Sequence, residues 1–239
     1  MLRVPSLKVG PDLRIFHSMN TTKRTVACVI FDIDGTLTQT NDLIFASFNH
    51  VAEKYLGRQF SPNEIIALFG PPEEGALQKV FGDENLEGIM EELCGFYAAH
   101  HASMASLHAG IDDVLAHLKD RGIRLAVFTG KGRRTAMITL NALRIAPYFD
   151  MVVSGNDVIN HKPHPEGILK VLEAFGLEPG QVLMVGDSLT DIRASRAAGV
   201  RIASVLWDSY EPERVRQANG ECVFDRVEEM LSWFRAHIN

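Results

Sequence analysis

Short apolar segments alternate with amphipathic ones along most of this 239-residue chain. Continuous apolar segments without a polar face are typical of strands that are buried on both sides of a parallel sheet. The chain contains five of them from Thr25 onward, at residues 26–31, 125–128, 151–153, 182–185 and 202–205. We therefore predict five buried strands.

The segments between most of these strands have the apolar spacing of amphipathic helices. Apolar residues recur every three to four positions in residues 111–121 and 165–175, and an alanine-rich helix over 189–198 is expected to end at Gly199. Strands that alternate with helices favour a Rossmann-like α/β fold, with a parallel sheet covered by helices on both faces. Ligands of such folds bind at the carboxyl ends of the strands.

One long segment, residues 39–108, breaks the alternation. It contains no convincing strand, and helices are predicted at 41–55, 61–69 and 86–104. The second begins with a capping box, Ser61-Pro62-Asn63-Glu64, with proline at the first helical position. We expect an α-helical cap domain over residues 39–108, inserted into an α/β core of residues 25–38 and 109–239. Residues 1–24 lie outside both parts, as a peripheral hairpin or a loose N-terminal arm.

The charge of the chain is mildly acidic and unevenly distributed. The formal net charge is −6, and residues 39–108, with three basic and ten acidic side chains, have a net charge of −7. A nucleic-acid partner is not expected, because it requires a basic surface. A membrane partner is not expected either, because no apolar run reaches the roughly 18 residues of a spanning helix. The first residues lack the apolar stretch of a signal peptide, and the three cysteines are far apart, so we expect reduced thiols and a cytoplasmic location.

The strongest chemical signal is Asp32-Ile33-Asp34-Gly35-Thr36, directly after the first predicted strand. Residues two apart on an extended chain point to the same side, so both carboxylates can enter one cavity. Two anions in a dry cleft require a compensating cation or proton, and oxygen ligands favour magnesium. A carboxylate can also attack phosphorus. The alternative is a simple strand-ending turn, since Asp-Gly pairs are common there.

Polar groups that suit phosphate follow the later strands as well. They are Thr129-Gly130-Lys131 after the second strand, Lys162-Pro163 after the third, and Asp187 and Asp191 after the fourth. Each has an ordinary alternative, such as a strand terminus, a surface lysine or a helix N-cap. Four such motifs in order, each at the carboxyl end of a strand, rarely coincide by chance. Together they predict a phosphate and metal site.

This ordered set resembles the haloacid dehalogenase-like superfamily of phosphohydrolases, from about Val26 to the C-terminus. The resemblance implies that Asp32 is a nucleophile, that Asp34 is a general acid and base, and that Thr129 and Lys162 bind the phosphoryl group. It further implies that Mg²⁺ is held by Asp32, the backbone carbonyl of Asp34 and Asp187, with Asp191 in the same acidic motif. Family members that cleave carbon–halogen or carbon–phosphorus bonds generally lack an acid at the position of Asp34. The expected reaction is therefore Mg²⁺-dependent hydrolysis of a phosphate ester or anhydride through an aspartyl-phosphate intermediate.

The cap is expected to select the substrate, because the core motifs contact only the transferred phosphoryl group. Thr40-Asn41 and Phe69-Gly70-Pro71-Pro72 resemble cap segments of phosphoglycolate phosphatases and of haloacid dehalogenase-type inorganic pyrophosphatases, which implies substrate contacts for Asn41 and Gly70. Gln39 departs from the aspartate that the family often has there, and the Gly-Pro-Pro segment is equally well explained as a rigid turn. The acidic cap favours a small phosphorylated metabolite or pyrophosphate over a large polyanion.

The backbone N–H groups after Thr129, including that of Gly130, are suited to hold phosphate oxygens. Two further groups of residues have no motif that assigns them a role. Lys131, Arg133 and Arg134 either meet a second anionic group, a carboxylate or another phosphate, or form a solvated helix start. His100, His101 and His108 are interpreted as ordinary surface or hinge residues rather than metal ligands.

Two rival functions use similar residues. A phosphomutase would use the same core and the same intermediate inside a closed cap, and the sequence does not separate it from a phosphatase. A phospho-receiver signalling module also has acidic residues, a threonine and a lysine on an α/β sheet, but the Asp-x-Asp-Gly-Thr motif, Pro163 and the helical insertion argue against it. The oligomeric state is left open.

Overall fold

The computed structural model describes residues 26–219 and 222–238. Its centre is a six-stranded parallel sheet of order β5-β4-β1-β6-β7-β8. The strands are β1 (Cys28–Phe31), β4 (Arg124–Phe128), β5 (Met151–Val153), β6 (Val182–Gly186), β7 (Arg201–Val205) and β8 (Val223–Phe224). All five predicted strands are present, and β8 is added at the edge, where two residues are too few to produce a recognisable pattern. The N-terminal arm expected at residues 1–24 lies outside the described residues.

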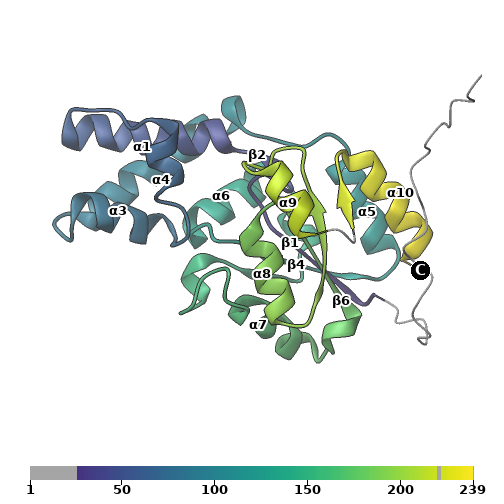
Figure 1. Ribbon diagram of the computed structural model, residues 1–239. Coiled ribbons are helices and arrows are strands. Elements are labelled where there is room, and N and C mark those ends of the chain that lie inside the picture. The colour runs from purple at the N-terminus through teal and green to yellow at the C-terminus, as the bar shows by residue number, and fades with distance from the viewer. Residues whose placement is uncertain (1–25, 220–221, 239) are drawn as a thin grey trace, which may run out of the picture.

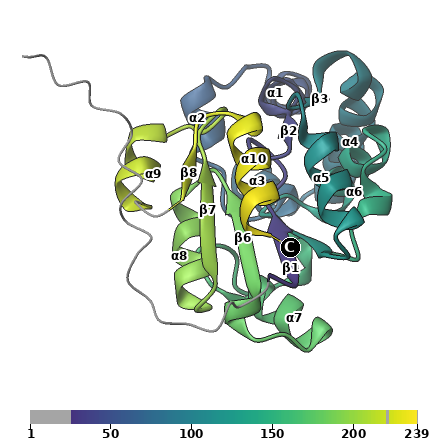
Figure 2. The ribbon, with the colours of Figure 1, turned by 90° about the vertical axis from the view of Figure 1, so that its right-hand side faces the viewer.

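Alternating residues of β1 point into two separate cores. Val29 and Phe31 pack with α5 (Ile111–Asp120), α6 (Arg133–Ala142) and α10 (Val227–His237). Cys28 and Ile30 pack with α7 (Glu166–Phe175), α8 (Leu189–Ala197) and α9 (Pro212–Ala218) on the other face. The strand is therefore apolar throughout because both faces are covered, and the fold is the predicted Rossmann-like one. Figure 2 shows the paired strands β6 and β7 side by side.

Four helices form a separate lobe beside the sheet (Figure 1). They are α1 (Asn41–Leu56), α2 (Pro62–Ile66), α3 (Glu73–Phe81) and α4 (Leu86–Met104), and they enclose their own apolar core, which includes Leu43, Leu77 and Leu93. The capping box of Ser61 and Glu64 is present. The helix predicted over 61–69 is shorter, however, because the chain turns after Ile66 towards Pro71, and α3 follows as a helix that the sequence analysis did not predict.

The expectation of no strand near the cap was wrong at its two ends. β2 (Thr38–Gln39) pairs antiparallel with β3 (Ser106–Leu107), so the two chain crossings between sheet and cap lie side by side. Strands of two residues have no alternating pattern to detect. Within the described residues, no helix is both long enough and apolar enough to cross a membrane.

The histidines near this junction differ from one another. His100 is exposed, as expected of a surface residue. His108 lies at the hinge but is buried, where its Nδ1 pairs with Gln39 Nε2 at 3.2 Å and its ring packs on Trp207. His101 is buried against Tyr97, so its interpretation as a surface or hinge residue was wrong.

Candidate active site

The turn after β1 carries Asp32 and Asp34 to the carboxyl edge of the sheet, next to the end of β6. Gly35 has a φ of +76°, and a Cβ there would lie 2.7 Å from Asp187 Oδ2. Only glycine permits both this backbone conformation and this close approach. The Asp34-Gly35 pair therefore forms a turn, as the simpler interpretation held. This turn also brings the segment of Asp32 and Asp34 into contact with Asp187.

Three carboxylates gather at this edge. Asp32, Asp187 and Asp191 each offer an oxygen, and these oxygens lie within 4.8 Å of one another. Lys162 Nζ lies 2.6 Å from Asp191 Oδ1 and 3.2 Å from Asp32 Oδ1. The Thr36 hydroxyl donates to Asp187 Oδ1 at 2.9 Å. One lysine therefore faces three acids, and the cluster is short of positive charge.

The protonation behaviour of the cluster reflects this shortage. Burial raises the pKa of Asp32 to about 6, although Lys162 acts in the opposite direction. Burial, and after it the neighbouring Asp32 and Asp191 carboxylates, raise the pKa of Asp187 well above its usual range. Without a further cation the site favours the protonated forms of Asp32 and Asp187, because ionised carboxylates are costly in a buried site. An all-oxygen set of this kind fits a hard divalent cation, which would replace those protons.

The end of β4 contributes Thr129, Gly130 and Lys131. Thr129 is buried, and its Oγ1 accepts a hydrogen bond from the backbone N–H of Lys131 at 3.1 Å. Lys131 Nζ lies 3.3 Å from both carboxylate oxygens of Asp34. Burial alone would lower the pKa of Lys131, but Asp34, Tyr97 and Glu73 together outweigh burial and raise that pKa. Lys131 therefore remains charged and orients Asp34.

Arg133 and Arg134 do not line the cavity, contrary to one of the two readings left open. They lie in the first turn of α6 and point outward, where Arg133 pairs with Asp157 at 3.0 Å and Arg134 with Glu87 at 2.6 Å. Successive residues of a helix diverge by about 100°, so nearness in sequence to Lys131 does not place them in the site.

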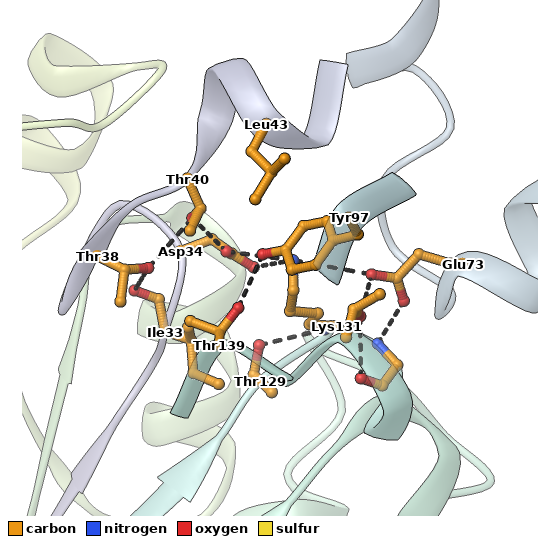
Figure 3. Close-up of polar contacts among 12 residues, drawn as sticks. Ile33, Asp34, Thr38, Thr40, Leu43, Glu73, Tyr97, Thr129, Lys131 and Thr139 are labelled. Carbon is orange, nitrogen blue, oxygen red and sulfur yellow. Dashed lines mark hydrogen bonds and ion pairs between the residues drawn. The ribbon is translucent and has the colours of Figure 1, made fainter. Parts of the chain in front are cut away.

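Asp34 has a second partner at the entrance to the cap. The Thr40 hydroxyl donates to Asp34 Oδ1 at 2.5 Å, and Thr38 and Thr40 share a hydrogen bond at 3.1 Å. Asp34 thus lies between Thr40 and Lys131 (Figure 3). The Thr40-Asn41 pair was noted in the sequence for its resemblance to cap segments, but its contact with Asp34 was not foreseen.

The cap contacts the core through Glu73, the first residue of α3, as well as through α4, where the Tyr97 hydroxyl pairs with that of Thr139. Its carboxylate accepts hydrogen bonds from the backbone N–H of Gly132 and from the Thr135 hydroxyl, both at 2.5 Å. Its Oε1 also lies 3.8 Å from Lys131 Nζ. A carboxylate is favourable there because Gly132 is the N-cap of α6, where the helix dipole is positive. Sequence analysis missed Glu73.

A cavity of about 280 Å³ lies between sheet and cap. It is lined by nearly all the residues that the sequence analysis selected, namely Asp32, Asp34, Asn41, Gly70, Thr129, Gly130, Lys131, Lys162 and Asp187. Asp191 does not line the cavity but belongs to the carboxylate cluster behind it. Tyr210, which follows β7, also lines the cavity and was missed because no motif surrounds it.

Known proteins resemble this chain in sequence and in fold. Residues 29–205 match the family of haloacid dehalogenase-like hydrolases. The chain is 33% identical over 211 residues to a pyrophosphatase PpaX of Bacillus pumilus, covering 87% of this chain and 96% of that protein.

Two solved structures share the fold. One is described as a predicted phosphoglycolate phosphatase from Haemophilus somnus (TM-score 0.76, 24% identity, 87% of this chain and 97% of that one). The other is CbbY from Rhodobacter sphaeroides in complex with phosphate (TM-score 0.74, 22% identity, 86% and 96%). The motifs, the parallel sheet with its helical cap and the family match agree: this chain belongs to the haloacid dehalogenase-like hydrolases.

Proposed function

We propose that the protein is a Mg²⁺-dependent phosphatase that hydrolyses a small phosphate monoester or anhydride through a phosphoryl group carried on Asp32. The observation that carries the proposal is the convergence of Asp32, Asp34, Lys162 and the Asp187 carboxylate on one cavity. Phosphoryl transfer depends chiefly on alignment and on neutralising the charge of the phosphoryl oxygens. This cavity supplies a nucleophile, an acid and cations at short range.

Each residue has a distinct role in this proposal. Asp32 attacks phosphorus, while Lys162 and Thr129 hold the phosphoryl oxygens. Asp34 protonates the leaving oxygen and then takes a proton from the water that hydrolyses the intermediate. The contacts of Asp34 with Thr40 and Lys131 fix its orientation for both steps.

Mg²⁺ would be held by the Asp32 carboxylate, the backbone carbonyl of Asp34 and the Asp187 carboxylate. When bound, it supplies positive charge to the phosphoryl oxygens. Asp191 supports the site indirectly, since its Oδ1 pairs with Lys162 and its Oδ2 accepts from the Ser188 hydroxyl at 2.6 Å. The deficit of positive charge around these acids supports a divalent ion.

A substrate panel with and without Mg²⁺ tests the proposal. Phosphate release is measured with the native protein, with Asp32→Asn and with Asp42→Asn, a control on the exposed first turn of α1. Loss of the nucleophile is expected to lower turnover more than about 10³-fold, while the control stays near the native rate. Near-normal turnover by Asp32→Asn would contradict the proposal.

The same assay separates the rivals. A phosphomutase would return an isomerised sugar phosphate with little free phosphate. A receiver module would take up one phosphoryl group without steady release. Continuous release over many turnovers is the result expected here.

A further inference from the structure

The cavity has two halves of different chemistry. The core half carries the acids, Thr129 and the two lysines. The wall that the cap provides is mostly apolar, formed by Ile44, Phe48, Leu68, Phe69, Pro71 and Ala76. Among the described residues that line the cap half there is no lysine, arginine or histidine. The part of the substrate that leaves after phosphoryl transfer therefore faces apolar carbon and no free positive charge.

Neither lysine of the core half is available to a second anion. Lys162 is paired with Asp32 and Asp191 at 3.2 and 2.6 Å. Lys131 lies between Asp34 at 3.3 Å and Glu73 at 3.8 Å. Both side chains are buried, so their charges are directed to these carboxylates and to the phosphoryl oxygens.

Glu73 makes this half of the cavity unfavourable to anions. It is the charged residue among those that line the cap half, and its hydrogen bonds to Gly132 and Thr135 hold its carboxylate in place (Figure 3). A carboxylate or second phosphate on the leaving group would be buried beside Glu73, and the nearby cation, Lys131, already faces the Asp34 and Glu73 carboxylates. Burial of a further negative charge there is costly. Like charges at short range in a poorly hydrated site add to that cost.

Aromatic rings extend the apolar wall where cap and core meet. Tyr210 from the core packs near Phe69 from the cap, with 6.0 Å between ring centroids, and near Phe45 of α1 at 6.4 Å. These rings cover the leaving-group side where cap and core meet. With a volume of about 280 Å³, the cavity has the size expected for a small phosphorylated molecule.

We propose that the cap half selects phosphate monoesters whose leaving group is small, uncharged and largely apolar, and that Glu73 disfavours anionic leaving groups. This inference rests on the proposed phosphatase function and names the substrate class of the same site. It separates the protein from an enzyme whose best substrate is pyrophosphate or phosphoglycolate. Glu73 acts here as a specificity residue and takes no part in bond making.

A pair of matched substrates tests the selection directly. Isobutyl phosphate has the same number of non-hydrogen atoms as phosphoglycolate, with an isopropyl group in place of the carboxylate. We expect kcat/KM for isobutyl phosphate to exceed that for phosphoglycolate, and that for pyrophosphate, by about 10-fold or more. Equal or higher values for either anionic substrate would overturn the inference. If no substrate is hydrolysed faster than by Asp32→Asn, the phosphatase function itself fails, which is a separate result.

Two neighbouring variants test the role of Glu73. Glu73→Gln removes the negative charge and keeps an oxygen for Gly132 or Thr135. Glu74→Gln removes the same charge from the same helical turn, but Glu74 contacts Asn156 at 3.3 Å and does not line the cavity. The measured quantity is the ratio of kcat/KM for phosphoglycolate to that for isobutyl phosphate, which does not depend on how much protein is folded.

The ratio is expected to rise about five- to tenfold in Glu73→Gln and to stay within about twofold in Glu74→Gln. A structural role alone would lower both rates together and leave the ratio unchanged. An unchanged ratio in Glu73→Gln, or an equal rise in both variants, would overturn the assignment of Glu73.

Discussion

The two halves of the cavity are positioned by different parts of the structure: the core half by strands of the sheet, and the cap half by packing between helices. In the core half, every charged group follows a strand of one parallel sheet, and the paired strands β1, β4 and β6 fix where Asp32, Thr129 and Asp187 lie. In the cap half, the lining residues come from several helices and turns whose positions depend on packing against α6, as in the contacts of Glu73 and Tyr97. The core half is thus defined by local sequence and the cap half by tertiary contacts.

This difference suggests a division of labour. Groups fixed by the sheet act on the phosphoryl group, which is common to all substrates of the reaction. Groups brought in by the cap face the leaving group, which differs among substrates. Changes in the core half should therefore lower all rates alike, and changes in the cap half should alter the ratios between substrates.

After loss of the nucleophile itself, the largest effect is expected from Lys162→Met. Loss of this buried cation removes charge that offsets Asp32, Asp191 and the phosphoryl oxygens, so kcat/KM should fall about 10²- to 10³-fold for every substrate. Steady-state kinetics with charged and uncharged leaving groups measure it. Lys170→Met, a change at a half-buried lysine of α7 that does not line the cavity, is the control and should remain near the native value. A loss of kcat/KM confined to one substrate class would contradict the claim that core residues act on the phosphoryl group of every substrate.

The second effect concerns Mg²⁺ and pH. Asp32 has a pKa of about 6 when folded, above the usual value of 3.8, so the folded metal-free protein binds more protons than the unfolded chain at intermediate pH. Its contribution to the stability of the metal-free protein is therefore lost as pH rises from about 4 to 6. Mg²⁺ must displace this proton, so it binds more weakly below pH 6.

Thermal unfolding measures this linkage. At pH 7.5, Mg²⁺ at about 100 times its Kd should raise Tm by about 5–10 °C. The same Mg²⁺ concentration at pH 5 should give a much smaller rise, and the Asp187→Asn variant should respond weakly at both values. An equal rise at pH 5 and pH 7.5 would show that these carboxylates do not titrate with ion binding.

The smallest effect is expected at the junction of cap and core. The Tyr97 hydroxyl on α4 hydrogen-bonds the Thr139 hydroxyl on α6 at 2.8 Å, and both side chains are buried. Tyr97→Phe leaves Thr139 unpaired, which should cost about 1–2 kcal/mol of stability in urea unfolding. The rates should change less than about threefold and equally for all substrates. Tyr55→Phe on the exposed side of α1 is the control, and a similar loss there would contradict the role assigned to Tyr97.

Sequence analysis predicted the placement of residues where that placement depends on local order along the chain. Asp32, Thr129, Lys162 and Asp187 each follow an apolar segment that is recognisable without knowledge of the fold, and parallel strands bring their carboxyl ends together. The alternation of strands and helices was sufficient to predict the sheet. Burial on both faces of β1 explains its uninterrupted apolar run.

The sequence did not predict which residues line the cap half of the cavity. Glu73 and Glu74 are adjacent acids at the start of α3, a common pattern that stabilises a helix N-terminus. Which of them faces the core depends on the orientation of the whole helix. The alternatives for Arg133 and Arg134 stayed open for the same reason, since the direction of α6 decides that both point towards solvent. Tyr210 reaches the cavity from a loop without any motif.

The central claim is that Asp32 carries the phosphoryl group, and trapping that group tests it most directly. In Asp34→Asn, p-nitrophenyl phosphate can still transfer its phosphoryl group because its leaving group needs no protonation, while hydrolysis of the intermediate lacks its base. Acid quenching and peptide mass spectrometry are expected to find one phosphoryl group on the peptide that contains Asp32, and none when Asp32→Asn is added. A phosphoryl group on another residue, or release of p-nitrophenol with no phosphorylated peptide, would contradict the account.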